Sequence, residues 1–203
     1  MTPIPKPEGL PIWAVGARRA TPGTPGSSEL VALVRQESRT GDALLALLDA
    51  RGVLGLRHLL SAWAHLGRAR ERGQSRLRDR GAEFLLFVAG DDQLPRAITK
   101  VGVQPDTEEF VVVGEKPRTP GPLLAAWALK EAPDVYPRAS SASALDRLGI
   151  LEAERGIVAA AQWEGLVLER VALLEMSAPH PEERNPGGRS SKGHARPDPA
   201  KTS

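Results

Sequence analysis

The sequence contains no cysteine, and this absence excludes several kinds of chemistry. Without thiols the protein has no disulfide framework, no thiolate metal site and no cysteine nucleophile. Disulfides are common in secreted proteins, so a chain without cysteine fits an intracellular protein. We therefore expect a cytoplasmic location.

Long hydrophobic runs are absent as well. One of the longest, Phe84–Ala89, is far too short to cross a bilayer. The N-terminal residues carry prolines at positions 3, 5, 7 and 11 and lack the apolar segment of a secretory signal. The sequence thus predicts a soluble protein with no membrane partner.

Histidine is scarce, and the familiar catalytic motifs are missing. Four histidines are present, of which His180 and His194 lie near the C-terminus. His58 and His65 are seven residues apart on one predicted helix, but no acids accompany them at metal-ligand spacing. The sequence has no nucleophile elbow, no H-E-x-x-H motif and no phosphate-binding loop. We predict no metal, no cofactor and no catalytic residues.

The length and composition predict one folded domain with two tails. The chain has 203 residues, of which 41% are hydrophobic and 26% are charged, as in ordinary globular proteins. Residues 1–9 are rich in proline and are predicted to be a disordered tail. Residues 177–203 combine proline, glycine, serine and charge without apolar periodicity, which predicts a second disordered tail. The folded domain is expected to span residues 10–176.

Apolar periodicity predicts a mixed α/β (α+β) fold, in which a small central sheet is flanked by several helices. Strands are expected at 11–19, 83–89 and 110–113, and residues 43–50 are a plausible strand that periodicity alone does not settle. Helices are expected from Ser27 or Ser28 to Gln36, at 55–72, at 92–102, from Pro122, from Ser140 or Ser141 to Gly149, and over 152–176 with a break near Gly156 or Gly165.

The segment 83–103, EFLLFVAGDDQLPRAITKVGV, is expected to be a strand–turn–helix unit at the centre of the domain. Its first part is a continuous apolar run bounded by Gly81 and Gly90, which is typical of a buried strand. Asp91 or Asp92 is expected to cap the following helix, and a cation site at these carboxylates is the less favoured interpretation. That helix buries a stripe of Leu94, Ala97, Ile98 and Val101 and ends at Gly102.

Charge is unevenly distributed, although the formal net charge is only +2. Residues 57–80 contain seven arginines against Glu71 and Asp79, whereas residues 146–176 contain six acids and three arginines. This asymmetry suggests one face for an anionic partner and another face for a different partner. The plainer alternative is that both segments are solvated helix faces.

The order of these motifs resembles one protein family. The segments LLDARGVLGLRHLLSAWAHLGRA (47–69), EFLLFVAGDDQLPRAITKVGV (83–103) and GLVLERVALLEM (165–176), with the basic loop and the β-branched strand, resemble the small regulatory subunit of the KEOPS complex. The resemblance covers residues 11–176. It is carried by Asp49–Ala50, His58–Leu59, Arg76, Arg78, Glu83, Ala89–Gly90, Gln93–Leu94, Ala97–Ile98 and Gly102–Val103.

The resemblance implies a non-catalytic protein. Members of this family bind the small atypical kinase of KEOPS and recruit tRNA by its single-stranded 3′ CCA end for threonylcarbamoyl-adenosine modification. The other KEOPS subunits would then be indirect partners. The family pattern has an arginine where this chain has Asp92, so an RNA contact there is either lost or supplied by Arg96.

Single-stranded RNA binding requires cations for phosphates and surfaces for unstacked bases. Trp63 lies on an apolar stripe and is expected to be a core residue, so it offers no stacking platform. The candidate RNA-binding residues are Arg72, Arg76, Arg78, Gln93, Leu94, Arg96 and Lys100. For each arginine alone, a solvated surface charge is the alternative.

The kinase interface is expected on the last predicted helix, whose apolar arc is wider than one core contact requires. Its candidate residues are Leu166, Val167, Arg170, Val171 and Leu174, and simple core burial is the alternative for each of them.

Two other functions remain open. One is a pure protein-interaction module that regulates the kinase without binding RNA, which the presence of Asp92 would explain. The other is an unrelated enzyme using Asp91, Asp92 and His58, which requires those residues to converge on one pocket.

Overall fold

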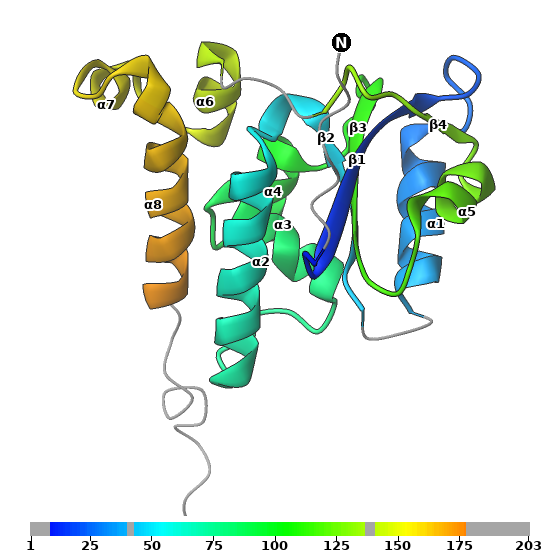
Figure 1. Ribbon diagram of the computed structural model, residues 1–203, viewed down its shortest axis with the longest axis horizontal. Coiled ribbons are helices and arrows are strands. Elements are labelled where there is room, and N and C mark those ends of the chain that lie inside the picture. The colour runs from blue at the N-terminus through cyan, green and yellow to red at the C-terminus, as the bar shows by residue number, and fades with distance from the viewer. Residues whose placement is uncertain (1–8, 40–42, 137–140, 178–203) are drawn as a thin grey trace, which may run out of the picture.

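The computed structural model describes residues 9–39, 43–136 and 141–177. Tails were predicted at 1–9 and 177–203, and all of their residues except Gly9 and Ser177 lie outside the described residues. The described residues form a mixed α/β fold, as predicted, with an antiparallel four-stranded sheet and helices on both of its faces (Figure 1). The elements in chain order are β1 (Ile12–Arg19), α1 (Ser27–Ser38), β2 (Leu45–Asp49), η1 (Ala50–Gly52), α2 (Leu56–Glu71), α3 (Arg80–Ala89), α4 (Leu94–Val101), β3 (Glu109–Glu115), α5 (Pro120–Ala126), β4 (Leu129–Glu131), α6 (Ala142–Leu148), α7 (Glu152–Gly156), η2 (Ala160–Gln162) and α8 (Trp163–Met176).

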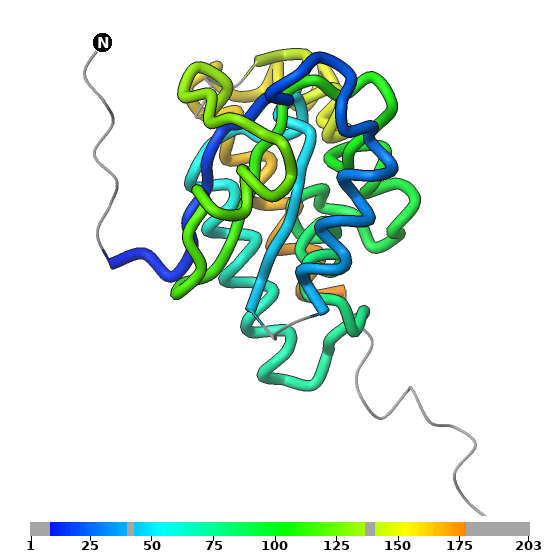
Figure 2. The backbone as a smooth tube through the Cα atoms, turned by 90° about the vertical axis from the view of Figure 1, so that its right-hand side faces the viewer, coloured from blue at the N-terminus to red at the C-terminus, as the bar shows by residue number. Residues whose placement is uncertain are grey.

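The sheet has the strand order β2-β3-β1-β4 and separates two hydrophobic layers. Successive side chains of a strand point to opposite faces, and β2 follows this rule. Ala46 and Leu48 join the core under α2, α3 and α8, whereas Leu45 and Leu47 join the smaller cluster under α1 and α5. Figure 1 shows these helices on opposite sides of the sheet, with α8 outermost. Figure 2, turned by 90°, shows α1 running along the side of the sheet that faces the viewer.

The strand predicted at 83–89 is wrong, because this segment belongs to helix α3. Asp79 caps the helix by accepting a hydrogen bond from the backbone N–H of Ala82 at 2.8 Å, and Gly90 ends it with a φ of +58°. The helix is buried on nearly all sides between β2, α2 and α4. A helix buried all round has no amphipathic period, so its continuous apolar run cannot be distinguished from a buried strand. The central unit is therefore helix–turn–helix.

Most other elements agree with the predictions. The strands expected at 11–19, 43–50 and 110–113 are β1, β2 and β3, and the helix expected at 55–72 is α2. The C-terminal helical region breaks after Gly156, as expected. Helix α5, however, begins at Pro120 rather than Pro122, and Ser27 does not cap α1. The Ser27 hydroxyl instead donates to the carbonyl of Gln104 at 2.8 Å, which ties α1 to the loop before β3.

No helix in the described ranges is long and apolar enough to span a membrane.

Candidate functional site

The arginines of the basic segment are largely paired with acids of this same chain. Arg72 Nη1 lies 2.7 Å from Glu175 Oε1, and Arg68 Nε lies 3.2 Å from Glu175 Oε2. These pairs join the end of α2 to α8, which packs along it (Figure 1). The basic segment and the acidic segment, which were each expected to face a different partner, therefore face each other.

Glu175 is the centre of this contact and is almost fully buried. Burial alone would raise the pKa of its carboxyl, but the hydrogen bond with His65 and the charge of Arg68 outweigh burial, so the pKa lies below its ordinary value. The carboxylate is consequently ionised at neutral pH and fixes the end of α8 to α2.

The buried side chain of Glu83 holds the loop between α2 and α3 in place through hydrogen bonds. This carboxylate is fully buried and accepts hydrogen bonds from Arg70 Nε at 2.9 Å, from the Ser75 hydroxyl at 2.9 Å and from the backbone N–H of Arg76 at 2.5 Å. With its backbone held in this way, Arg76 donates through Nη2 to the carbonyl of Leu174 at 2.8 Å. One loop side chain thus binds a C-terminal carbonyl of α8, where the helix dipole favours a cation.

Two of the predicted RNA-binding cations, Arg96 and Lys100, lie on α4 and are both paired with Asp91. Arg96 Nε lies 2.9 Å and Lys100 Nζ 3.0 Å from this carboxylate, and Arg96 also reaches Asp92 at 2.9 Å. The prediction that Asp91 or Asp92 caps α4 is wrong, because the N-cap residue is Gln93 and has no side-chain cap hydrogen bond. Asp91 instead accepts a hydrogen bond from the backbone N–H of Gln93 at 3.0 Å, just before the helix. Burial raises the pKa of Asp91, but the Gln93 N–H, Lys100 and Arg96 together hold it below its ordinary value.

Arg96 and Lys100 share an open hollow of about 350 Å³ with the end of α8, which contributes Arg170, Leu173, Leu174 and Ser177 to the lining. Arg76 reaches the same place through Leu174 and Ser177. Three of the predicted cations therefore converge, and Arg72 is adjacent through Glu175. Nearly all of these cations have an acidic or carbonyl partner, which leaves little unneutralised charge here.

The residues of the enzyme hypothesis are not brought together. His58 is fully buried, with Nε2 2.8 Å from the carbonyl of Val88 and Nδ1 accepting from the N–H of Leu54 at 3.4 Å. Burial lowers the pKa of His58 to about 4, so the ring is neutral and structural. The hollow beside Asp91 and Asp92 does not include it. This constellation has no common pocket among the described residues.

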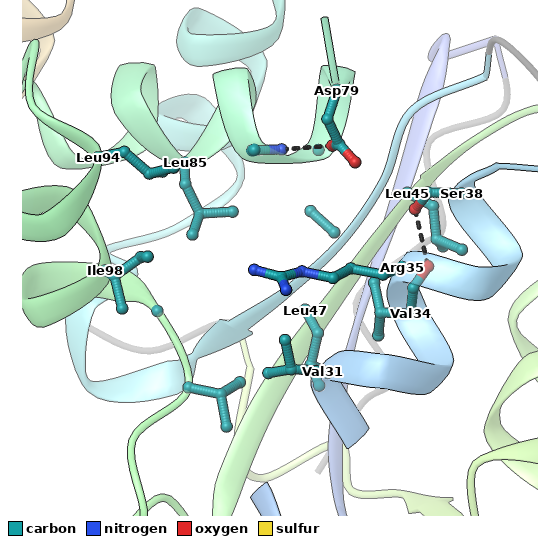
Figure 3. A pocket seen from close by; sticks show the side chains of 15 residues that line it. Val31, Val34, Arg35, Ser38, Leu45, Leu47, Asp79, Leu85, Leu94 and Ile98 are labelled. Carbon is teal, nitrogen blue, oxygen red and sulfur yellow. Dashed lines mark hydrogen bonds between the residues drawn. The ribbon is translucent and has the colours of Figure 1, made fainter. Parts of the chain in front are cut away.

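A second cavity, which we call the slot, opens on the other side of α4 (Figure 3). It has a volume of about 130 Å³ and lies between α1, β2, α3 and α4. Its walls are mainly apolar, with Val31, Val34, Leu47, Leu85, Leu94 and Ile98. Leu94, predicted to contact RNA, is thus on the slot, whereas Arg96 and Lys100 are on the hollow.

One cation projects into the slot and was missed by the sequence predictions. Arg35 reaches from α1 across the opening (Figure 3), and no described residue forms an ion pair or hydrogen bond with its guanidinium. Asp79 lies on the opposite wall, where its carboxylate caps α3. The preceding residue, the predicted Arg78, is exposed. Arg35 stands alone in an ordinary amphipathic helix, so no local pattern distinguished it.

The predicted kinase-interface residues mostly face inward. Val167, Val171 and Leu174 are buried in the main core, Leu166 packs against that core, and Arg170 donates to Glu154 at 2.9 Å. The apolar residues that α8 leaves exposed are instead Leu173, at 61%, and Met176, at 81%. The sequence did not separate the two sides because this helix is apolar nearly all round.

Comparison with known proteins does not assign the chain: no family model matches it, and no curated protein matches it.

Proposed function

We propose that this protein is a non-catalytic subunit of a KEOPS-type complex, which binds the atypical kinase of that complex and recruits tRNA by its 3′ CCA end. The proposal starts from the ordered motifs of the sequence. Three residues of that pattern, Asp49, His58 and Glu83, are fully buried polar groups with internal partners. Buried polar residues are tolerated only where the fold supplies such partners, so these three residues have structural roles, and the proposal rests on the order and spacing of the motifs together.

The slot is the observation that carries the RNA-binding part. An unstacked base requires an apolar cleft, and its phosphates require cations nearby. Leu94 and Ile98 supply apolar surface, and Arg35 supplies a cation at the opening. The exposed Arg78, which precedes the lining residue Asp79 in the chain, is the second cation of this proposal. The hollow beside Arg96 is less suitable because its cations are already paired.

Filter binding with two transcripts tests this part directly. A full-length tRNA should bind more tightly than the same tRNA trimmed of its CCA end, because trimming removes the single-stranded CCA bases that would enter the slot. Equal affinity for the two transcripts would contradict 3′-end recognition.

The kinase-binding part rests on the outer side of α8. This helix is packed on one side only, and it exposes Leu173 and Met176 to solvent. Exposed large apolar side chains on one helix face are typical of helix-mediated interfaces. A pull-down with the purified kinase of a KEOPS complex tests it, and Leu173→Glu should abolish capture while the fold is retained.

The internal pairing of the basic segment favours one alternative, a kinase-binding module without RNA affinity. Asp92 stands where the family pattern has an arginine, and its carboxylate pairs with Arg96. This alternative predicts capture of the kinase together with no shift of tRNA at moderate salt.

A further inference from the structure

The floor of the slot is the free edge of strand β2. β2 is the outer strand of the sheet beside β3, and residues 45–47 line the slot. In an antiparallel pair, the residues that hydrogen-bond across the pair alternate with residues whose N–H and C=O point away. Leu44 is opposite Glu115, whose N–H donates to the Leu44 carbonyl at 3.0 Å. The backbone groups of Leu45 and Leu47 therefore point away from β3.

One end of this free edge is closed by α3. A Cβ on Gly81 would lie 2.4 Å from the carbonyl oxygen of Leu45, so the first turn of α3 packs directly against that group. A fifth strand cannot add along the whole edge for this reason. The part of the edge that stays open is therefore the backbone N–H and C=O of Leu47, and the walls around it are mainly apolar.

These features define the ligand more closely than the cavity alone. A donor and an acceptor on one residue are complementary to a planar group that presents an acceptor beside a donor, as the hydrogen-bonding edge of a nucleobase does. The walls from α1 on one side and α4 on the other suit the two apolar faces of such a ring. Arg35, with no acceptor among the described residues, lies at the opening where a phosphate would follow the ring.

We infer that the slot binds one nucleotide, with its base against the free backbone groups of Leu47, between α1 and α4, and its phosphate on Arg35. This inference rests on the proposed function and extends it, since it assigns the base contacts to backbone groups and the phosphate to a residue of α1. It also assigns no role in RNA binding to Arg96 and Lys100, whose charges are offset by Asp91 and Asp92.

The test is an NMR titration of the ¹⁵N- and methyl-labelled full chain with AMP and with adenosine. Both should shift the backbone amide of Leu47 and the methyl groups of Leu94 and Ile98. AMP should bind about two- to fivefold more tightly than adenosine, the range expected for one partly exposed ion pair. Shifts that leave Leu47 and the slot methyl groups unchanged would overturn the inference.

Matched variants isolate Arg35. Arg35→Gln should bind AMP and adenosine equally, whereas Arg39→Gln should keep the wild-type preference, because Arg39 is exposed at the C-cap of the same helix and does not line the slot. A preference for AMP that survives in Arg35→Gln would refute the phosphate contact.

The two proposals can fail separately. If trimming the CCA end weakens tRNA binding while AMP leaves Leu47 unshifted, the inference fails and the proposed function stands. If AMP binds in the slot as described but full and trimmed tRNA bind equally, the slot is a nucleotide site and the proposed tRNA function fails.

Discussion

At the scale of single residues, buried polar side chains fix the irregular parts of the chain. Asp49, at the end of β2, accepts from the backbone N–H of Arg51 at 2.9 Å, from Thr107 at 2.8 Å and from Arg147 at 3.0 Å. Burial raises the pKa of Asp49, but the hydrogen bonds from Arg51 and Thr107 and the charge of Arg147 outweigh it, so the carboxylate is ionised. Each such residue joins segments far apart in the sequence.

Burial of His58 should make the stability of the fold depend on pH. Its pKa of about 4 in the folded protein lies below the ordinary 6.5, so the unfolded chain binds more protons and stability falls as pH decreases from about 6.5 to 4. Between pH 7.5 and 5 this group alone should remove about 2 kcal/mol from the free energy of unfolding. Urea unfolding of wild type and His58→Gln at both pH values measures it. The variant should be less stable at pH 7.5 but should lose less on acidification, and equal losses would contradict the assignment.

Gly81 is required for close packing rather than for its conformation. Gly81→Ala would place a Cβ against the Leu45 carbonyl, and we expect a loss of about 1–3 kcal/mol because neither backbone can move freely. Gly67→Ala in α2 is the matched control, since nothing lies within 4 Å of its Cβ position. The control should gain roughly 0.5–1 kcal/mol from helix propensity. Chemical unfolding distinguishes the two, and a Gly81→Ala protein as stable as the control would be inconsistent with this packing.

At the scale of elements, the loop between α2 and α3 holds the end of α8. Arg76→Gln removes the guanidinium that binds the Leu174 carbonyl, so the last turn of α8 should fray. Hydrogen–deuterium exchange should be faster for the last turn of α8 in this variant. Arg78→Gln is the control, since the Arg78 side chain is exposed in the same loop. Unchanged exchange in Arg76→Gln would show that α8 is held by its apolar contacts alone.

Helix α8 has an inner and an outer side, and substitutions should separate them. Val171→Ala on the inner side should cost roughly 1–3 kcal/mol through lost burial and a small cavity. Leu173→Glu on the exposed side should change stability by about 0.5 kcal/mol or less, yet abolish capture of the kinase. Thermal unfolding and the pull-down together check both sides. Capture by Leu173→Glu at the wild-type level would exclude this side as the interface.

At the scale of the whole molecule, internal pairing changes the expected dependence of RNA binding on salt. Seven arginines between residues 57 and 80 suggest a steep dependence, but acids on α3, α8 and β3 neutralise most of them. If Arg35 and Arg78 are the two phosphate-binding cations, as proposed, the slope of log K against log salt should be about −1.4, or roughly −0.7 for each single-strand phosphate contact. Filter binding across a salt series measures the slope. Arg78→Gln should halve it, and a slope several times steeper would show that the paired arginines also contact RNA.

The sequence by itself determined the elements that have a clear period or a cap. The alternation of β1, the β-branched run of β3, the 3.6-residue stripe of α2 and the cap of α6 by Ser141 are local properties, so each was predicted from a few residues. Of the residues that line the slot, Leu94 was among the predicted site residues, because it stands within a recognisable motif.

Only the tertiary structure decided the rest, for one physical reason. Burial and electrostatic pairing depend on residues distant in the sequence. Helix α3 is apolar on nearly every side because it is enclosed by other elements, and this hides its period. Glu175 neutralises arginines that are more than a hundred residues away, which no local charge count reveals. The slot is formed by α1 and α4 on either side of the edge of β2. Arg35 lines it because α1 is packed at that edge.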